Sequence, residues 1–148
     1  EYTHYLDEKG ADAYAIAMHI KKHKRVTPFA ENIKRIRGMS IFNADPDHFT
    51  CDALGQVMSM PAQELARLED AEVFTLANSV KNDLTVSYDE YLQYLAAAIE
   101  AARILGTVSA ELAELREKLK YITPQAGLVN ELVARSRACL CELQGCGK

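Results

Sequence analysis

Two histidines are the first residues of this sequence that could hold a metal ion. His19 and His23 stand four residues apart, a spacing that places two imidazoles on one face of a helix. The HEXXH motif of zinc proteases is absent, and two ligands do not complete a metal site. Lys21, Lys22 and Lys24 also surround the pair with positive charge, which opposes a cation. We interpret the pair as solvated histidines at a basic helix end, and a metal site is the alternative.

Three cysteines near the end of the sequence form the second candidate. Cys139, Cys141 and Cys146 lie within eight residues, and Cys51 could supply a fourth thiolate. The spacing is not the CxxC of common zinc sites, and residues two apart in a helix point to different faces. We therefore interpret these thiols as structural or incidental. A metal or cluster site and redox regulation are the alternatives.

The sequence contains no motif that identifies a catalytic site. A GxSxG elbow, a phosphate-binding P-loop and a GxGxxG turn are all absent. The acidic pairs at 69–70 and 89–90 are typical of first helical turns, where the helix dipole favours negative charge. We predict no enzymatic activity and no cofactor.

Basic residues are concentrated in one short segment. Residues 21–37 hold seven of them and a single acid, Glu31, so this segment carries +6 while the remainder of the chain carries −10. The seven are Lys21, Lys22, Lys24, Arg25, Lys34, Arg35 and Arg37. This pattern indicates a negatively charged partner. The alternative is a pair of helices with solvated outer faces.

Hydrophobic periodicity predicts an all-α chain that positions these residues. Prolines 28, 46, 61 and 124 each precede an apolar stretch with helical spacing, as expected of helix starts. Ser87 and Glu90 form a capping box, and glycines 38 and 106 follow helical stretches. Helices are expected over about 8–24, 28–37, 46–57, 61–68, 70–81, 87–106, 110–121 and 124–143.

The expected architecture is a compact bundle of about seven to eight short and medium helices. We predict a single domain over 1–148, because no linker separates the two halves. Its N-terminal helical lobe covers about 1–84. The helices over about 87–143 form an antiparallel hairpin or three-helix unit, and a flexible tail rich in cysteine and glycine covers 144–148.

One segment resembles a known family. Residues 53–84 read ALGQVMSMPAQELARLEDAEVFTLANSVKNDL, which resembles the helical part of tail-assembly chaperones of contractile-tailed and Mu-like phages. The features that match are Leu54, Val57, Pro61, Leu65, Leu68, Asp70, Leu76 and Val80. The β-rich opening segment of that family is missing here, and extra helices are present. The resemblance implies a non-enzymatic protein that coats another chain during assembly.

These observations favour a protein that acts by binding another protein, as an adaptor, an assembly chaperone or an inhibitor. The expected contact residues are the seven basic residues of 21–37, and the expected partner has an acidic surface. Non-specific nucleic-acid binding through the same segment is the first alternative. Metal or cluster binding by the C-terminal cysteines is the second.

We expect a cytoplasmic protein without a membrane partner. Four cysteines in 148 residues are too few for a disulfide scaffold, which favours a reducing compartment. No signal-peptide pattern opens the sequence. The longest uncharged apolar stretch, 91–99, is far shorter than the roughly 20 residues that span a bilayer.

Overall fold

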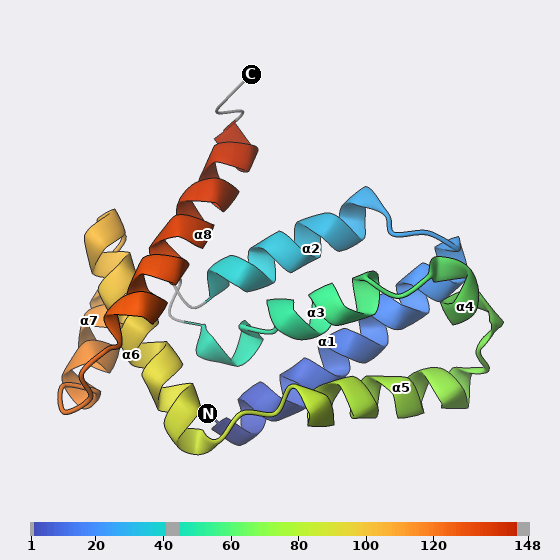
Figure 1. Cartoon of the computed structure of the whole chain (residues 1–148), viewed down its shortest axis with the longest axis horizontal. Helices are drawn as coiled ribbons and strands as arrows, with labels where there is room; N and C mark the ends of the chain where they lie inside the picture. Colours follow the sequence, from blue (N-terminus) through green and yellow to red (C-terminus); the bar gives the residue numbers. More distant parts are fainter. Residues whose placement is uncertain (1, 41–44, 145–148) are drawn as a thin grey trace. The chain divides into compact units, whose positions relative to one another are not determined.

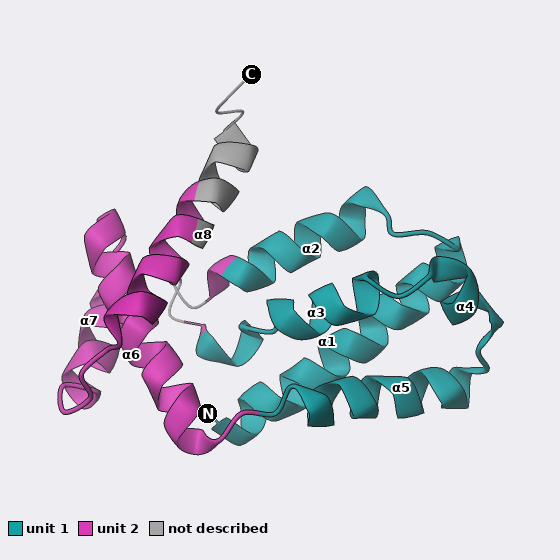
Figure 2. Ribbon diagram, viewed as in Figure 1, with its two compact units in different colours: residues 1–38, 46–85 teal, residues 39–45, 86–148 magenta. Residues whose placement is uncertain are grey.

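A computed structural model describes residues 2–40 and 45–144, with the backbone alone described at 135 and 138–144. Within these ranges the chain forms eight α-helices and no strand, which confirms the all-α prediction. Figure 1 shows these helices, and the chain divides into two compact units (Figure 2). One comprises residues 1–38 and 46–85, and the other comprises residues 39–45 and 86–148. The expectation of a single domain stays a prediction.

The first unit contains five of the helices. They are α1 (Tyr2–His23), α2 (Pro28–Met39, whose last residue falls in the second unit), α3 (Cys51–Met58), α4 (Ala62–Arg67) and α5 (Asp70–Asp83), with the 3-10 turn η2 (Pro46–His48) before α3. The second unit contains α6 (Tyr88–Leu105), α7 (Ala110–Lys118) and α8 (Ala126–Gln144). The predicted three-helix unit in the C-terminal part is therefore confirmed.

Several predicted helix boundaries were wrong. Gly38 does not end α2, which continues to Met39, because Gly38 does not adopt the left-handed conformation that closes a helix. Gly106 does adopt it, with φ of 73°, and ends α6 as predicted. Pro46 starts only a 3-10 turn, and α3 begins at Cys51. Of these two glycines, the one with a left-handed backbone ends its helix and the other does not.

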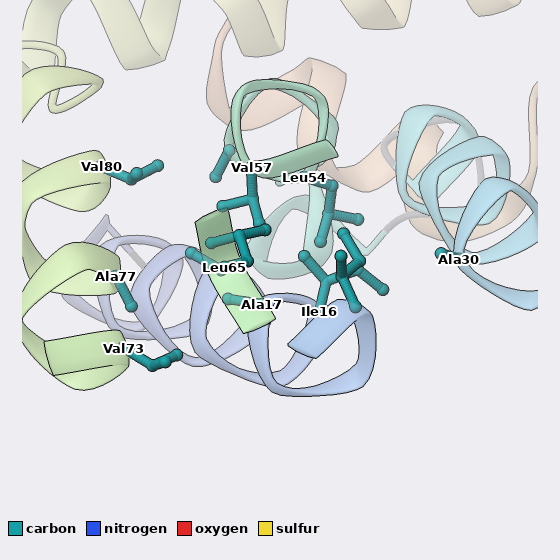
Figure 3. Close-up of a cluster of buried hydrophobic side chains, with 12 residues drawn as sticks. Ile16, Ala17, Ala30, Leu54, Val57, Leu65, Val73, Ala77 and Val80 are labelled. Atoms are coloured by element: carbon teal, nitrogen blue, oxygen red, sulfur yellow. The ribbon is translucent and has the colours of Figure 1, made fainter. Parts of the chain in front are cut away.

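The core of the first unit is built around α1, which contacts α3, α4, α5 and η2. Figure 3 shows its buried apolar side chains converging from several helices. The members are Ala13, Ile16, Ala17, Ile20, Ala30, Ala53, Leu54, Val57, Leu65, Val73, Ala77 and Val80. Alanines on α1, α2, α3 and α5 allow the helices to approach closely, so branched residues from the neighbouring helices fill the space between them.

The second unit rests on the packing of α6 against α8. Ser87 caps α6 by accepting from Glu90 N–H, and the Glu90 carboxylate accepts from Ser87 N–H at 2.8 Å. The predicted capping box is thus confirmed. α6 buries a broad face rich in alanine, and α7 buries only Leu112. Among the described residues of both units, no helix has the length and apolar character that crossing a membrane requires.

Candidate functional site

Two of the seven basic residues of 21–37 are held by acids of the same unit. Arg37 lies with Nε 2.8 Å from Asp12 Oδ2 and donates from Nη2 to Asp12 Oδ1 at 3.2 Å. Lys21 pairs with Asp70 at the start of α5. These side chains join α2 and α5 to α1. Their charge is therefore largely neutralised within the chain.

The other five make no ion pair with any residue that the structure describes. Arg35 is half-buried on α2, and Lys34 extends over α3, where a Cβ on Gly55 would lie 3.4 Å from Lys34 Cε. Lys22, Lys24 and Arg25 are exposed together where α1 ends and α2 has not yet begun. We call these three residues the basic turn.

The backbone of the basic turn is fixed by the end of one helix and the start of the next. Lys24 has φ of 56°, a left-handed conformation that is uncommon outside glycine, and its N–H donates to Ile20 O at 2.7 Å. Lys22 stands in the last turn of α1, and Lys24 and Arg25 follow its C-terminus, where the helix dipole favours positive charge. Thr27 then caps α2, because its Oγ1 accepts from Ala30 N–H at 3.2 Å.

Three rings lie beside the basic turn. The His19 ring centroid is 4.4 Å from that of His23 and 5.2 Å from that of Phe29. His19 Nε2 also lies 2.7 Å from Thr27 Oγ1. Burial, together with the charges of His23 and Lys22, holds the pKa of His19 below its ordinary value. The imidazole of His19 is therefore a neutral packing group at pH 7.

Phe29 adds an apolar contact to this region. It stands in the first turn of α2 with 58% of its surface exposed. Aromatic residues and arginine are enriched at protein interfaces, where a few such side chains supply much of the binding energy. Phe29 and the basic turn together form the candidate partner-binding surface.

The described part of the chain contains no complete metal site of the kind that the histidine and cysteine spacings suggested. His19 and His23 do come together, but no group of three His, Cys, Asp or Glu side chains that could hold a metal ion occurs among the described residues. Cys51 is the half-buried first residue of α3. The side chains of Cys139 and Cys141, and all of Cys146, lie outside the described residues. A metal or cluster site there stays a prediction.

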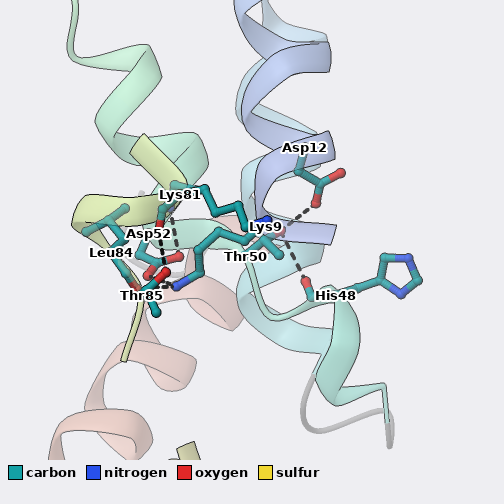
Figure 4. Close-up of polar contacts among 9 residues, drawn as sticks. Lys9, Asp12, His48, Thr50, Asp52, Lys81, Leu84 and Thr85 are labelled. Atoms are coloured by element: carbon teal, nitrogen blue, oxygen red, sulfur yellow. Dashed lines mark hydrogen bonds and ion pairs between the residues drawn. The ribbon is translucent and has the colours of Figure 1, made fainter. Parts of the chain in front are cut away.

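A fully buried lysine is the feature that sequence reasoning missed. Lys9 donates to Asp52 Oδ2 at 2.9 Å and to Leu84 O at 2.8 Å (Figure 4). Its Nζ also lies 4.6 Å from the Tyr5 ring centroid. A signal was available in the sequence, because Lys9 falls in the same helical row as the buried Tyr5 and Ala13. A charge in an apolar row indicates a buried partner.

A second polar contact lies one turn further along α1. Asp12, which holds Arg37, also accepts from the buried Thr50 hydroxyl (Figure 4). Through Lys9 and Asp12, α1 therefore joins α2, α3 and α5 by charged hydrogen bonds as well as by apolar packing. Because Lys9 is fully buried and engaged, we assign this polar cluster a role in the fold and not in contact with a ligand.

The second unit contains a pocket of about 500 Å³ between α6 and α7. Its carboxylates are engaged: Glu100 accepts hydrogen bonds from Arg103 Nε and Nη2, and Glu117 pairs with Lys120. The hydrogen bonds from Arg103 hold the pKa of Glu100 below its ordinary value. A general acid or base near neutral pH requires the opposite shift, so Glu100 does not indicate catalysis.

Comparison of the chain with protein-family models, with curated proteins and with solved structures gives no match.

Proposed function

We propose that this protein is a non-enzymatic protein-binding module whose contact surface is the basic turn together with Phe29. The observation that carries the proposal is the set of three exposed cations, Lys22, Lys24 and Arg25, that have no acidic partner among the described residues and stand beside a 58% exposed aromatic ring. Such a surface fits an acidic protein patch that also offers an apolar contact.

The compact size of this surface favours a protein over a nucleic acid. A protein that tracks a phosphate backbone neutralises several phosphates along a stripe of cations. Here Lys21 and Arg37 are engaged by Asp70 and Asp12, which interrupts any such stripe. The remainder of the chain is acidic and repels an extended polyanion. Adaptor, assembly chaperone and inhibitor are roles that this surface could serve, and the resemblance of 53–84 to tail-assembly chaperones stays a prediction.

The test is a capture experiment from the lysate of the native host with three forms of the chain. The wild type is compared with the triple variant Lys22→Glu, Lys24→Glu and Arg25→Glu. The matched control reverses three other exposed cations, with Arg67→Glu, Lys118→Glu and Arg137→Glu, so both variants have the same net charge. Each capture is run with and without nuclease and read by mass spectrometry, and the captured protein is then purified and titrated directly.

The proposal predicts one protein partner that binds the wild type and the control, resists nuclease, and is lost with the basic-turn variant. The purified partner should bind the variant at least about 30-fold more weakly than the wild type, as expected when a charged contact centre is removed. Equal binding by all three forms would show that the basic turn is not the partner-binding surface. Partners that disappear with nuclease would establish nucleic-acid binding in its place.

A further inference from the structure

The outer face of α1 and α5 carries three contacts in a row. These two helices run antiparallel and side by side, as Figure 1 shows. At one end Asp7 pairs with Lys81 at 3.6 Å, in the middle the rings of Tyr14 and Phe74 meet edge to face at 6.0 Å, and at the other end Lys21 pairs with Asp70 at 2.5 Å. On α1 the three residues are spaced by seven, so they share one side of that helix.

The two ion pairs are arranged with opposite polarity. At the first end the acid, Asp7, stands on α1 and the lysine stands on α5. At the second end the lysine, Lys21, stands on α1 and the acid stands on α5. Exposure follows the same pattern, because the acidic side chains are 69% and 68% exposed while the lysine side chains are 27% and 24% exposed. The face therefore has nearly the same charge pattern after a half turn about its centre.

A hollow lies at the end of this face that carries Asp7 and Lys81, and both of these side chains line it. Gly10, Ala11 and Ala77 line a groove of about 490 Å³ next to Tyr14, and the ring of Phe74 stands at its edge with 59% of its surface exposed. A Cβ on Gly10 would lie 3.1 Å from Lys81 Cδ, so the glycine allows the lysine stem to lie against α1. A projecting aromatic ring and a hollow lined by small residues thus occur on one face.

We propose that this face binds a second copy of the chain about a twofold axis that runs parallel to the two helices. That axis places α1 of each copy opposite α5 of the other. Asp7 then meets Lys81 of the second copy, Lys21 meets Asp70, and each Phe74 meets Tyr14 and the groove beside it. Every charge faces its opposite, and every ring faces an apolar surface.

A second copy is the occupant that explains both the charges and the ring. Twofold contacts use the same patch on both subunits, so the patch must be complementary to itself. About an axis parallel to the helices, the acid and the lysine of each ion pair between α1 and α5 face the opposite charges of the second copy, and this holds at both ends of the row. Charge-poor, aromatic centres with charged rims are also typical of protein interfaces.

The size of this face determines how tightly the proposed dimer is expected to bind. Residues 7 to 21 of α1 span about 21 Å, and two packed helices are about 20 Å wide. Two such faces bury on the order of 1,000 Å² in total, which lies at the lower end for specific interfaces. We therefore expect a reversible dimer with a dissociation constant on the order of micromolar, weakened by salt.

The test is sedimentation velocity of the full chain over about 1 µM to 1 mM, with a matched pair of variants. Phe74→Glu places a charge at the centre of the proposed interface. Phe29→Glu makes the same change at a ring of almost equal exposure, 58% against 59%, on the other candidate surface. Because both rings are exposed, neither change should unfold the chain, and circular dichroism at 222 nm verifies this.

The wild type and Phe29→Glu should shift with concentration from one chain of 16.5 kDa to twice that mass. Phe74→Glu should weaken dimerisation by about 30-fold or more. The exchange Asp7→Lys with Lys81→Asp should leave dimerisation intact, because opposite charges still meet across this axis. A wild type that stays monomeric to 1 mM, a Phe74→Glu variant that dimerises like the wild type, or a charge exchange that abolishes the dimer would each overturn the proposal.

This test is independent of the proposed function. Phe29→Glu should lose the captured partner and keep the dimer, whereas Phe74→Glu should keep binding to the basic turn and lose the dimer. Each proposal is therefore tested by its own variant, and the failure of one does not contradict the other.

Discussion

Removing Asp52 should destabilise the protein more than removing the buried lysine that it holds. Lys9 is fully buried, whereas the Asp52 side chain is 43% exposed. In Asp52→Asn the ammonium group stays buried without an anionic partner, and Leu84 O and the Tyr5 ring remain beside it. In Lys9→Met the side chain keeps its length and loses its charge, and water can reach the Asp52 carboxylate.

The magnitudes follow from this asymmetry. Breaking a buried ion pair so that a charge remains unpaired costs about 3–5 kcal/mol of the free energy of unfolding. Lys9→Met leaves the Leu84 carbonyl without its donor, at a cost of about 1–2 kcal/mol. The double variant contains no buried charge, so its cost should be close to that of Lys9→Met alone. Asparagine also keeps an oxygen that can accept from Ala53 N–H, as Asp52 Oδ1 does.

The assay is urea unfolding followed by circular dichroism at 222 nm, carried out as a double-mutant cycle. An exposed pair on α7, Glu114 and Lys118, provides the matched control, with Glu114→Gln, Lys118→Met and the double variant. We expect coupling in the buried cycle and none above experimental error in the exposed one. Additive costs for Lys9 and Asp52, or a larger loss in Lys9→Met than in Asp52→Asn, would refute the reasoning.

Three further predictions follow from local contacts. Ser87→Ala should lower the free energy of unfolding by about 1 kcal/mol, because the hydroxyl that accepts from Glu90 N–H is lost; urea unfolding measures it, and no change would contradict the capping role. Lys24→Gly should have a free energy of unfolding about 0.5 kcal/mol higher than that of Lys24→Ala, because glycine adopts a φ of 56° without strain. Equal urea midpoints for the two variants would contradict backbone strain at this position. His19 has its pKa lowered in the folded state, so the unfolded chain binds the proton more tightly and stability should fall as the pH drops below about 6.5, which is the ordinary histidine pKa. This loss, measured by thermal unfolding between pH 7.5 and 5.5, should be smaller in His19→Gln.

Local patterns in the sequence predicted where most helices lie and how some of them end. Ser87 with Glu90, and Gly106 with its left-handed φ, are found as predicted, because capping depends on residues within one turn. Thr27 caps α2 for the same reason. Gly38 was assigned the wrong role, since a glycine ends a helix only when the backbone reverses there, and this depends on packing beyond the neighbouring residues.

The candidate site was only partly predictable. The sequence contained seven basic residues in one segment, but nothing local distinguishes Lys22, which is exposed, from Lys21, which pairs with Asp70 forty-nine positions away. Arg37 pairs with Asp12 in the same way across twenty-five positions. Which charges remain for a partner is decided by long-range ion pairs, and these exist only after α1, α2 and α5 have packed.

The sequence by itself determined that this protein is all-α, where its helices lie, and that positive charge gathers between residues 21 and 37, because helical periodicity, caps and composition act over a few residues. The tertiary structure alone decided that Lys9 is buried against Asp52, that the basic turn has no acidic partner among the described residues, and that two ion pairs of opposite polarity join α1 to α5. Each of these depends on residues far apart in the chain, and only the packing of the folded core brings them within reach of one another.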